Sequence, residues 1–194
     1  MRYEKGHKDN TRQRIVEAAG ERFRRDGIET VGIGSLMAGI GLTQGGFYNH
    51  FDSKDDLVRE VVGSSLHEKL ERMRELNAGQ RHAGIAKLVD YYLSAAHRDD
   101  AAAGCTCSAL AMEIARSSAP TRAAFTDELR ATLALIGEQL PASLKPKPRR
   151  EKAQAIFASM VGTLALARAV DDPALADDLL AAGRRAALAL ARVA

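Results

Sequence analysis

Glycine and alanine divide this chain into two unlike parts. Nine of its 16 glycines fall in residues 1–52, which hold only three of its 35 alanines. Clustered glycines indicate sharp turns and close backbone approaches, whereas alanine is the strongest helix former and a poor strand former. We therefore predict an all-α protein with a small, tightly turned domain over residues 1–52 and a larger helical domain over residues 53–194.

Composition excludes several classes of protein. The chain has 194 residues, of which 46% are hydrophobic and 27% charged, so it can bury a core and is not disordered throughout. Its longest stretch without a formal charge, residues 153–167, is shorter than the roughly 20 residues of a membrane span, and the N-terminus lacks the apolar run of a secretory signal. Two cysteines, Cys105 and Cys107, make neither a disulfide framework nor a complete zinc site. We expect a cytoplasmic protein without metal, cofactor or membrane contact.

Helical periodicity and stop signals predict about nine helices and no strand. They cover Thr11–Asp26, Ile33–Ile40, Gln44–His50, Lys54–Leu76, Arg81–His97, Cys105–Arg116, Thr121–Leu140, Arg149–Val170 and Pro173–Val193. Gly27 stops the first helix, Ser53 with Asp56 resembles a capping box, and Asp172 before a proline starts the last helix. The basic run 145–150 is expected to be an exposed connector.

The stretch 41–54 carries the most chemical information. Two short helices joined by a three-residue turn with glycine have the form of a helix-turn-helix, whose second helix enters the major groove of DNA. Thr43 can cap that second helix, and Gln44 has the donor and acceptor that suit an adenine edge. Gly45 and Gly46 each cost a helix up to about 1 kcal/mol relative to alanine. Close approach of the backbone to a duplex would explain them.

The polar residues that follow fit the same interpretation. Tyr48 and His50 can donate to phosphate oxygens, and Lys54 adds a cation, while Phe47 and Phe51 are expected to pack the small core. A compact helical hairpin in a purely structural adaptor is the alternative. It leaves the paired glycines and the Tyr-x-His pattern unexplained.

The pattern Thr43-x-Gly45-x-x-Tyr48-x-His50-Phe51-x-Ser53-Lys54 resembles the recognition-helix signature of the TetR family of bacterial transcriptional regulators. The resemblance implies a double-stranded DNA operator as partner and a homodimer formed through the last two helices. It also implies that the following residues face DNA: Gly34, Ser35, Gln44, Gly45, Gly46, Tyr48, Asn49, His50 and Lys54, beside the capping Thr43.

The N-terminal segment is basic. Residues 1–14 carry five cations against two acids, so they form either an arm along phosphates or a solvated terminus. Arg12 and Arg14 lie on the first predicted helix and are expected to reach DNA.

The middle of the helical domain is the expected pocket for a small-molecule effector. Its candidate lining residues are Tyr91, Tyr92, His97, Cys105, Met112, Arg116, Phe125, Phe157, Met160 and Arg168, although each of them also suits ordinary core or surface. Cys105 falls at a predicted helix start, where the helix dipole favours a thiolate. Gly104-Cys105 followed by Glu113 is similar to electrophile-sensing TetR members, whereas a buried cysteine is otherwise a small apolar filler.

Three functions compete on this sequence. The first is a ligand-responsive dimeric regulator, usually a repressor in the family, released from its palindromic operator by a small molecule or an electrophile. The second is a thiol-dependent enzyme built on Cys105 and His97. No Gly-rich phosphate loop, carboxylate pair or metal-ligand set supports catalysis, so we expect no enzyme. The adaptor is the third.

Overall fold

The computed structural model describes residues 5–64 and 84–192, and over them it has ten helices and no strand. The prediction of an all-α protein is confirmed, and the predicted count of about nine helices is close. In the described part, none of the helices has the length and apolar character that crossing a membrane requires.

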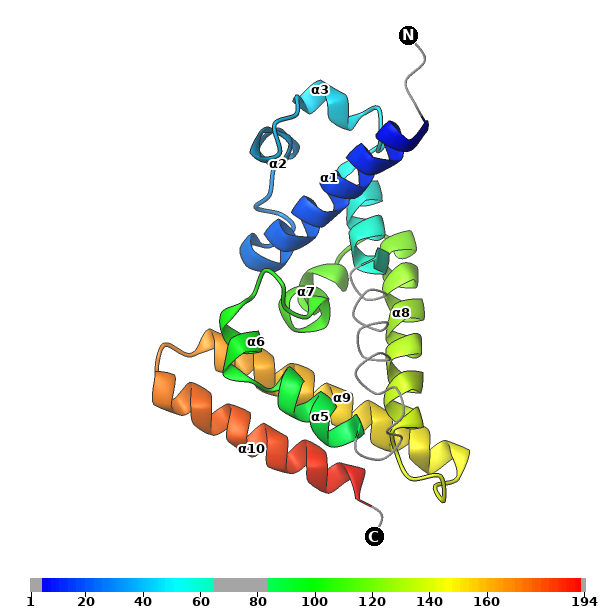
Figure 1. Cartoon of the computed structure of the whole chain (residues 1–194), viewed down its shortest axis with the longest axis vertical. Helices are drawn as coiled ribbons and strands as arrows, with labels where there is room; N and C mark the ends of the chain where they lie inside the picture. Colours follow the sequence, from blue (N-terminus) through cyan, green and yellow to red (C-terminus); the bar gives the residue numbers. More distant parts are fainter. Residues whose placement is uncertain (1–4, 65–83, 193–194) are drawn as a thin grey trace. The chain divides into compact units, whose positions relative to one another are not determined.

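The N-terminal helices are α1 (Lys5–Asp26), α2 (Ile33–Gly39), α3 (Gln44–Phe47) and a helix over residues 54–64 (Figure 1). Gly27 ends α1 with φ +87°, and Gly41 lies between α2 and α3 with φ +75°. Both angles fall in the left-handed region that glycine adopts without strain. The predicted stop at Gly27 is confirmed. The predicted helix 54–76 is described only to residue 64, and α3 ends three residues earlier than predicted.

The later helices are α5 (Gly84–Tyr92), α6 (Ala95–Asp99), α7 (Thr106–Ile114), α8 (Ala119–Glu138), α9 (Pro146–Ala169) and α10 (Pro173–Ala191). The single helix predicted over 81–97 is wrong for the described residues, because the chain breaks between α5 and α6. Ser94 causes the break: its backbone is extended, and its hydroxyl accepts the N–H of His97 as the cap of α6. Asp172 caps α10 as predicted, accepting the N–H groups of Ala174 and Leu175.

The basic run 145–150 is not the connector that was predicted, because α9 begins at Pro146. Proline is tolerated in a first helical turn, where its missing N–H has no intrahelical partner to lose. Arg149 then donates from Nη2 to the carbonyls of Pro141, Ala142 and Leu144 at 3.0–3.1 Å. This guanidinium therefore fixes the connection that precedes α9.

The chain folds into two compact units that do not follow the order of the sequence. One unit consists of residues 1–65 with 101–126, and the other of residues 66–100 with 127–194. Residues 101–126, with α7 and the start of α8, thus belong with the N-terminal helices. The functional division at residues 52 and 53 remains a prediction.

The first unit has an aromatic and aliphatic core. Its buried side chains include Ile15, Val16, Ala19, Phe23, Leu36, Met37, Phe47, Phe51, Leu57, Val58, Val61 and Val62. The rings of Phe47 and Phe51 stack with centroids 5.3 Å apart. Both were predicted to pack the small core, and the structure bears this out.

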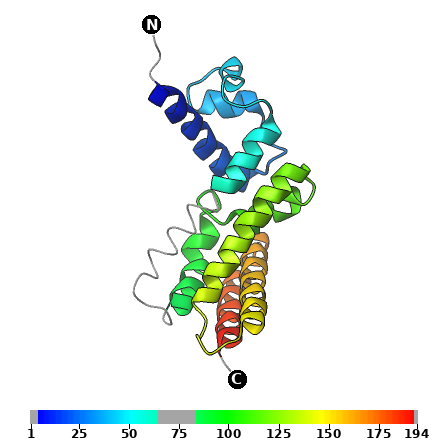
Figure 2. The same cartoon turned by 90° about the vertical axis from the view of Figure 1, so that its right-hand side faces the viewer.

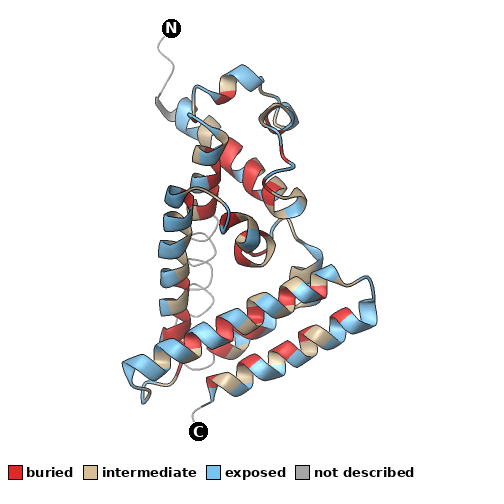
Figure 3. Cartoon of the chain, turned by 180° about the vertical axis from the view of Figure 1, so that it is seen from behind, coloured by how far each residue is buried: buried red, intermediate tan, exposed pale blue. Residues whose placement is uncertain are grey.

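In the second unit, α9 and α10 lie side by side and run in opposite directions (Figures 1 and 2). Gly183 allows their close approach, because a Cβ atom there would lie 2.4 Å from Cγ2 of Thr163. Buried and exposed residues alternate along both helices (Figure 3), and the exposed ones include the large side chains Leu166 and Leu175.

Candidate nucleic-acid interface

The start of α3 is built by Thr43. Its backbone is extended, with φ −86° and ψ 150°, and its Oγ1 accepts the N–H of Gly46 at 3.3 Å. The cap predicted from the sequence is thus present. Thr43, Gln44 and Gly45 are all exposed, so the first turn of α3 offers both side chains and backbone to a partner.

The two glycines of α3 have different surroundings. A Cβ atom at Gly45 would meet nothing within 4 Å, whereas one at Gly46 would lie 3.5 Å from Oγ1 of Thr43 and 3.9 Å from Cε of Met37. Gly46 therefore faces the protein, and Gly45 faces open space. Among residues 5–64 and 84–192, nothing near position 45 requires glycine there.

Tyr48 follows α3 and is 57% exposed. Its ring meets the buried ring of Phe47 edge-on, with centroids 5.3 Å apart. Phe47 in turn stacks on Phe51. The aromatic core thereby fixes the base of a side chain whose hydroxyl can reach a phosphate oxygen.

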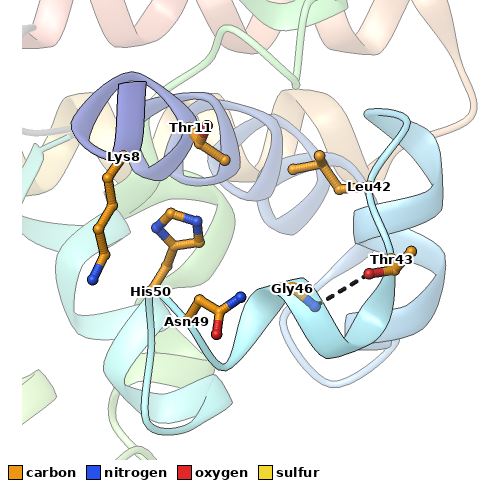
Figure 4. A pocket seen from close by; sticks show the side chains of 7 residues that line it. All are labelled: Lys8, Thr11, Leu42, Thr43, Gly46, Asn49 and His50. Carbon is orange, nitrogen blue, oxygen red and sulfur yellow. Dashed lines mark hydrogen bonds between the residues drawn. The ribbon is translucent and has the colours of Figure 1, made fainter. Parts of the chain in front are cut away.

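An open cavity of about 500 Å³ lies between α1 and the segment around α3 (Figure 4). We call it the α1–α3 cavity; it is lined by Lys8, Thr11, Leu42, Thr43, Gly46, Asn49 and His50. An ammonium, hydroxyls, an amide and an imidazole converge on it. Such donors suit an anionic oxygen group, and a backbone phosphate of DNA carries one.

His50 contributes a partly buried imidazole to this cavity. Its Nδ1 is buried and makes no hydrogen bond to the described residues. Burial lowers the pKa of His50 below its ordinary value of 6.5, and the charges of Lys8 and Arg12 lower it further. The imidazole is therefore neutral near pH 7 in the free protein.

The structure engages two of the predicted DNA-contacting cations within the protein. Arg12 donates from Nε to Glu60 at 3.0 Å and from Nη1 to the carbonyl of His50, and its guanidinium lies 4.1 Å from the ring centroid of Phe51. Lys54 donates from Nζ to the carbonyl of Glu29 at 3.4 Å. Arg12 thus contacts the segment after α3, and Lys54 links the start of the next helix to the loop between α1 and α2.

The predicted residues on α2 lie next to the start of α3. A Cβ atom at Gly34 would lie 3.1 Å from Oε1 of Gln44, so the glycine leaves room for that side chain. Ser35 is exposed, donates to the carbonyl of Gly32 and accepts from Arg22 at 3.3 Å. Of the residues predicted to contact DNA, Gly34 and Ser35 of α2 therefore lie close to those of α3.

Lys8 and Thr11 were not assigned as individual site residues by the sequence. The basic composition of residues 1–14 was the only signal for them. Arg14, which was expected to reach DNA, donates to the carbonyl of Ile40 at 3.1 Å.

The predicted effector-pocket residues divide between the two compact units. Cys105, Met112, Arg116 and Phe125 belong to the first unit, and Tyr91, Tyr92, His97, Phe157, Met160 and Arg168 to the second. In the second, Tyr92 lies edge-on to His97 and Phe157, with centroids 4.9 and 6.2 Å apart. Arg168 donates to the carbonyl of His97 at 2.5 Å. A single pocket that joins all ten residues stays a prediction.

Exposure separates these residues further. Met112 is 73% exposed, and Tyr91 is 47% exposed, whereas Met160 is fully buried. Cys105 occupies the N-cap position of α7 without a side-chain capping bond, and both it and Cys107 are buried free thiols. Within the described ranges, no group of three His, Cys, Asp or Glu residues could hold a metal ion.

Comparison with known proteins agrees with this geometry. Residues 15–61 match the family model for bacterial regulatory proteins, tetR family. The uncharacterized HTH-type transcriptional regulator YfiR of Bacillus subtilis is 30% identical over 89 residues, which are 46% of this chain and 42% of YfiR. The chain thus spans less than half the length of that curated relative.

Solved structures resemble the fold over nearly the whole chain. Reduced NemR of E. coli superposes with a TM-score of 0.75 at 18% identity, covering 92% of this chain and 95% of NemR. FadR of Bacillus subtilis, solved in complex with stearoyl-CoA, superposes with a TM-score of 0.69 at 19% identity, covering 92% and 97%. At these identities the likeness establishes the fold alone.

Proposed function

We propose that this chain is a member of the tetR family of bacterial regulatory proteins, whose model matches residues 15–61, and that it binds a dyad-symmetric DNA operator as a homodimer. The observation that carries the proposal is the surface around α3. There Gly45 opens to solvent, Tyr48 is exposed on an aromatic base, and the α1–α3 cavity lies beside them. Backbone and hydroxyl donors of the segment around α3 and the ammonium of Lys8 on α1 thus border one surface. This arrangement suits an α-helix that reads the major groove between two phosphate contacts.

The homodimer would form through α9 and α10. On α9, Ala158, Gly162 and Leu166 are exposed at spacings of four residues, and Leu166 is 57% exposed. On α10, Leu175 is 46% exposed. An exposed apolar stripe of this kind favours packing against a second helical surface. Two copies of the chain would then present two α3 helices to two half-sites.

A repressor in this role would release its operator when a small molecule binds the helical domain. The effector would stabilise a conformation whose two α3 helices no longer match the half-site spacing. The structural neighbour FadR was solved in complex with stearoyl-CoA. This complex supports the proposal that a protein of this fold binds a small molecule. Regulation of this kind takes place on the chromosome, so we place the protein in the cytoplasm.

An electrophile acting at Cys105 is our specific hypothesis for the effector. The thiol lies at the N-terminus of α7, a position that favours thiolate chemistry. We expect Cys105→Ser to bind operator DNA like the wild type but to resist release by a thiol-reactive compound such as N-ethylmaleimide. Cys107→Ser is the matched control and should still be released. Equal release of wild type and Cys105→Ser would refute the hypothesis.

Selection of bound duplexes from a random pool tests the proposed function. We expect wild-type protein to enrich a dyad-symmetric sequence with half-sites about one helical turn apart, and binding to weaken steeply with salt. Tyr48→Ala should bind the enriched duplex at least about tenfold more weakly, since a hydrogen bond to a charged group is lost. Tyr48→Phe keeps the ring on Phe47 and isolates the hydroxyl. Enrichment of no dyad would contradict the proposal.

A further inference from the structure

Residues 101–126 form hydrogen bonds with α1 and with the helix over residues 54–64, at points far apart in the sequence. Arg24 of α1 donates from Nε to the carbonyl of Ala102. Asp55, on the helix 54–64, accepts the hydroxyls of Ser118 at 2.8 Å and Thr121 at 3.3 Å. The segment that contains α7 is therefore attached to both the first and the last helix of the helix-turn-helix region.

The most specific of these contacts involves Glu113, near the end of α7. Its Oε2 accepts the backbone N–H of Ile28 at 2.7 Å and that of Glu29 at 3.3 Å, across 85 and 84 residues of sequence. These two N–H groups follow the end of α1 and have no helical partner there. Gly27 makes the approach possible, because a Cβ atom at that position would lie 3.3 Å from Oε1 of Glu113.

The same short loop is held from its other side by a predicted DNA-contacting residue. The carbonyl of Glu29 accepts from Nζ of Lys54, which begins the helix after the recognition segment. The backbone of Glu29 thus contacts the carboxylate of Glu113 through its N–H and the ammonium of Lys54 through its carbonyl. Four residues later the chain enters α2 at Ile33, and Gly34 in its first turn lies against Gln44 of α3.

We propose that Glu113 is a positioning residue for DNA binding: its carboxylate sets the loop between α1 and α2 and thereby the placement of α2, α3 and Lys54. This inference rests on the proposed function, and it names Glu113 as the residue through which α7 influences DNA binding. Glu113 acts through the loop and not on DNA, since its carboxylate is occupied by backbone N–H donors.

Whether removal of the Glu113 carboxylate weakens or strengthens DNA binding distinguishes a positioning role from a purely electrostatic effect. Removing a carboxylate from a DNA-binding protein strengthens its attraction to phosphate by charge alone. Glu113→Ala is expected to do the opposite and to weaken binding to the selected dyad duplex about tenfold, equivalent to about 1.4 kcal/mol. Because no cation is lost, the slope of log K against log salt should stay as in the wild type.

Fluorescence anisotropy on the selected duplex, with hydrogen exchange of the Ile28 and Glu29 amides, forms the test. Glu113→Gln keeps the shape and one acceptor oxygen and should fall between wild type and Glu113→Ala, which guards against a misfolded alanine variant. Glu21→Ala removes an exposed carboxylate from α1 and should not weaken binding.

The outcomes are distinct. Faster amide exchange and weaker binding in Glu113→Ala, graded through Glu113→Gln, would support the inference. Unchanged affinity in Glu113→Ala with faster amide exchange would overturn the inference and leave the proposed function intact. If the wild type itself enriches no duplex, the proposed function fails, and the inference fails with it.

Discussion

Under the proposed function, folding and DNA binding make opposite demands at Gly45. Alanine is the better helix former, and a Cβ atom at Gly45 meets nothing within 4 Å. Gly45→Ala should leave the free energy of unfolding unchanged or raise it by up to about 1 kcal/mol. It should nevertheless bind the operator at least about tenfold more weakly, because the methyl group enters the space of the duplex. Urea unfolding and anisotropy measure the two quantities.

Gly39 provides the control for this substitution. It is also exposed and has nothing within 4 Å of its Cβ position, but it lies at the far end of α2 from the predicted contacts. Gly39→Ala should therefore bind DNA like the wild type. Equal affinity of wild type and Gly45→Ala would show that α3 does not bring its backbone close to a duplex.

His50 makes stability depend on pH. Its folded-state pKa lies below 6.5, so the unfolded chain takes up a proton at a higher pH than the folded protein does. The free energy of unfolding contributed by this residue is present above about pH 6.5 and decreases as the pH falls through that value. We expect the wild type to lose more stability than His50→Gln between about pH 7.5 and pH 5.5 in urea unfolding. Equal losses would contradict the assigned burial of the imidazole.

At the scale of elements, the contact between α9 and α10 depends on Gly183. A Cβ atom at this position would lie 2.4 Å from Cγ2 of Thr163, so one of the two helices must shift. Gly183→Ala should lower the free energy of unfolding by about 1–3 kcal/mol. Gly137→Ala is the matched control, because its Cβ atom would meet Arg149 Cγ at an ordinary 3.7 Å. Comparable unfolding curves for the two variants would argue against this close packing.

Local signals in the sequence located most of the helix ends. Thr43, Gly27 and Asp172 act on neighbours within three or four residues, so their roles follow from side-chain chemistry alone. The break at Ser94 was missed, although a serine cap is a local signal of the same kind. The start of α9 was placed too late because a proline-broken basic run is equally typical of a connector.

Long-range partners could not be obtained in this way. The residues predicted to face DNA were assigned by spacing and by resemblance, whereas the pairing of Arg12 with Glu60 spans 48 residues. The contact of Glu113 with the loop after α1 spans 85 residues. The local sequence around Glu60 or Glu113 does not indicate which distant residue its carboxylate contacts. Many other acidic residues lie on helices with similar neighbours.

At the scale of the whole molecule, the proposed homodimer would bring two α3 helices to act together. Leu166→Glu places a charge on the exposed apolar stripe of α9 and should shift the protein from dimer to monomer in sedimentation velocity. Affinity for the dyad should fall with it, because the second half-site is no longer engaged. Met112→Glu introduces the same charge at an exposed position on α7 and should remain dimeric. A dimeric Leu166→Glu would place the interface elsewhere.

The stoichiometry of binding to the selected duplex tests the central claim most directly. Sedimentation of wild-type protein with the full dyad, and separately with a single half-site of equal length, compares the two modes of binding. Two chains bound cooperatively to the full dyad, with much weaker binding to the half-site, is the predicted result. A single chain on each duplex, with equal affinity for both and for unrelated sequence, would contradict the account.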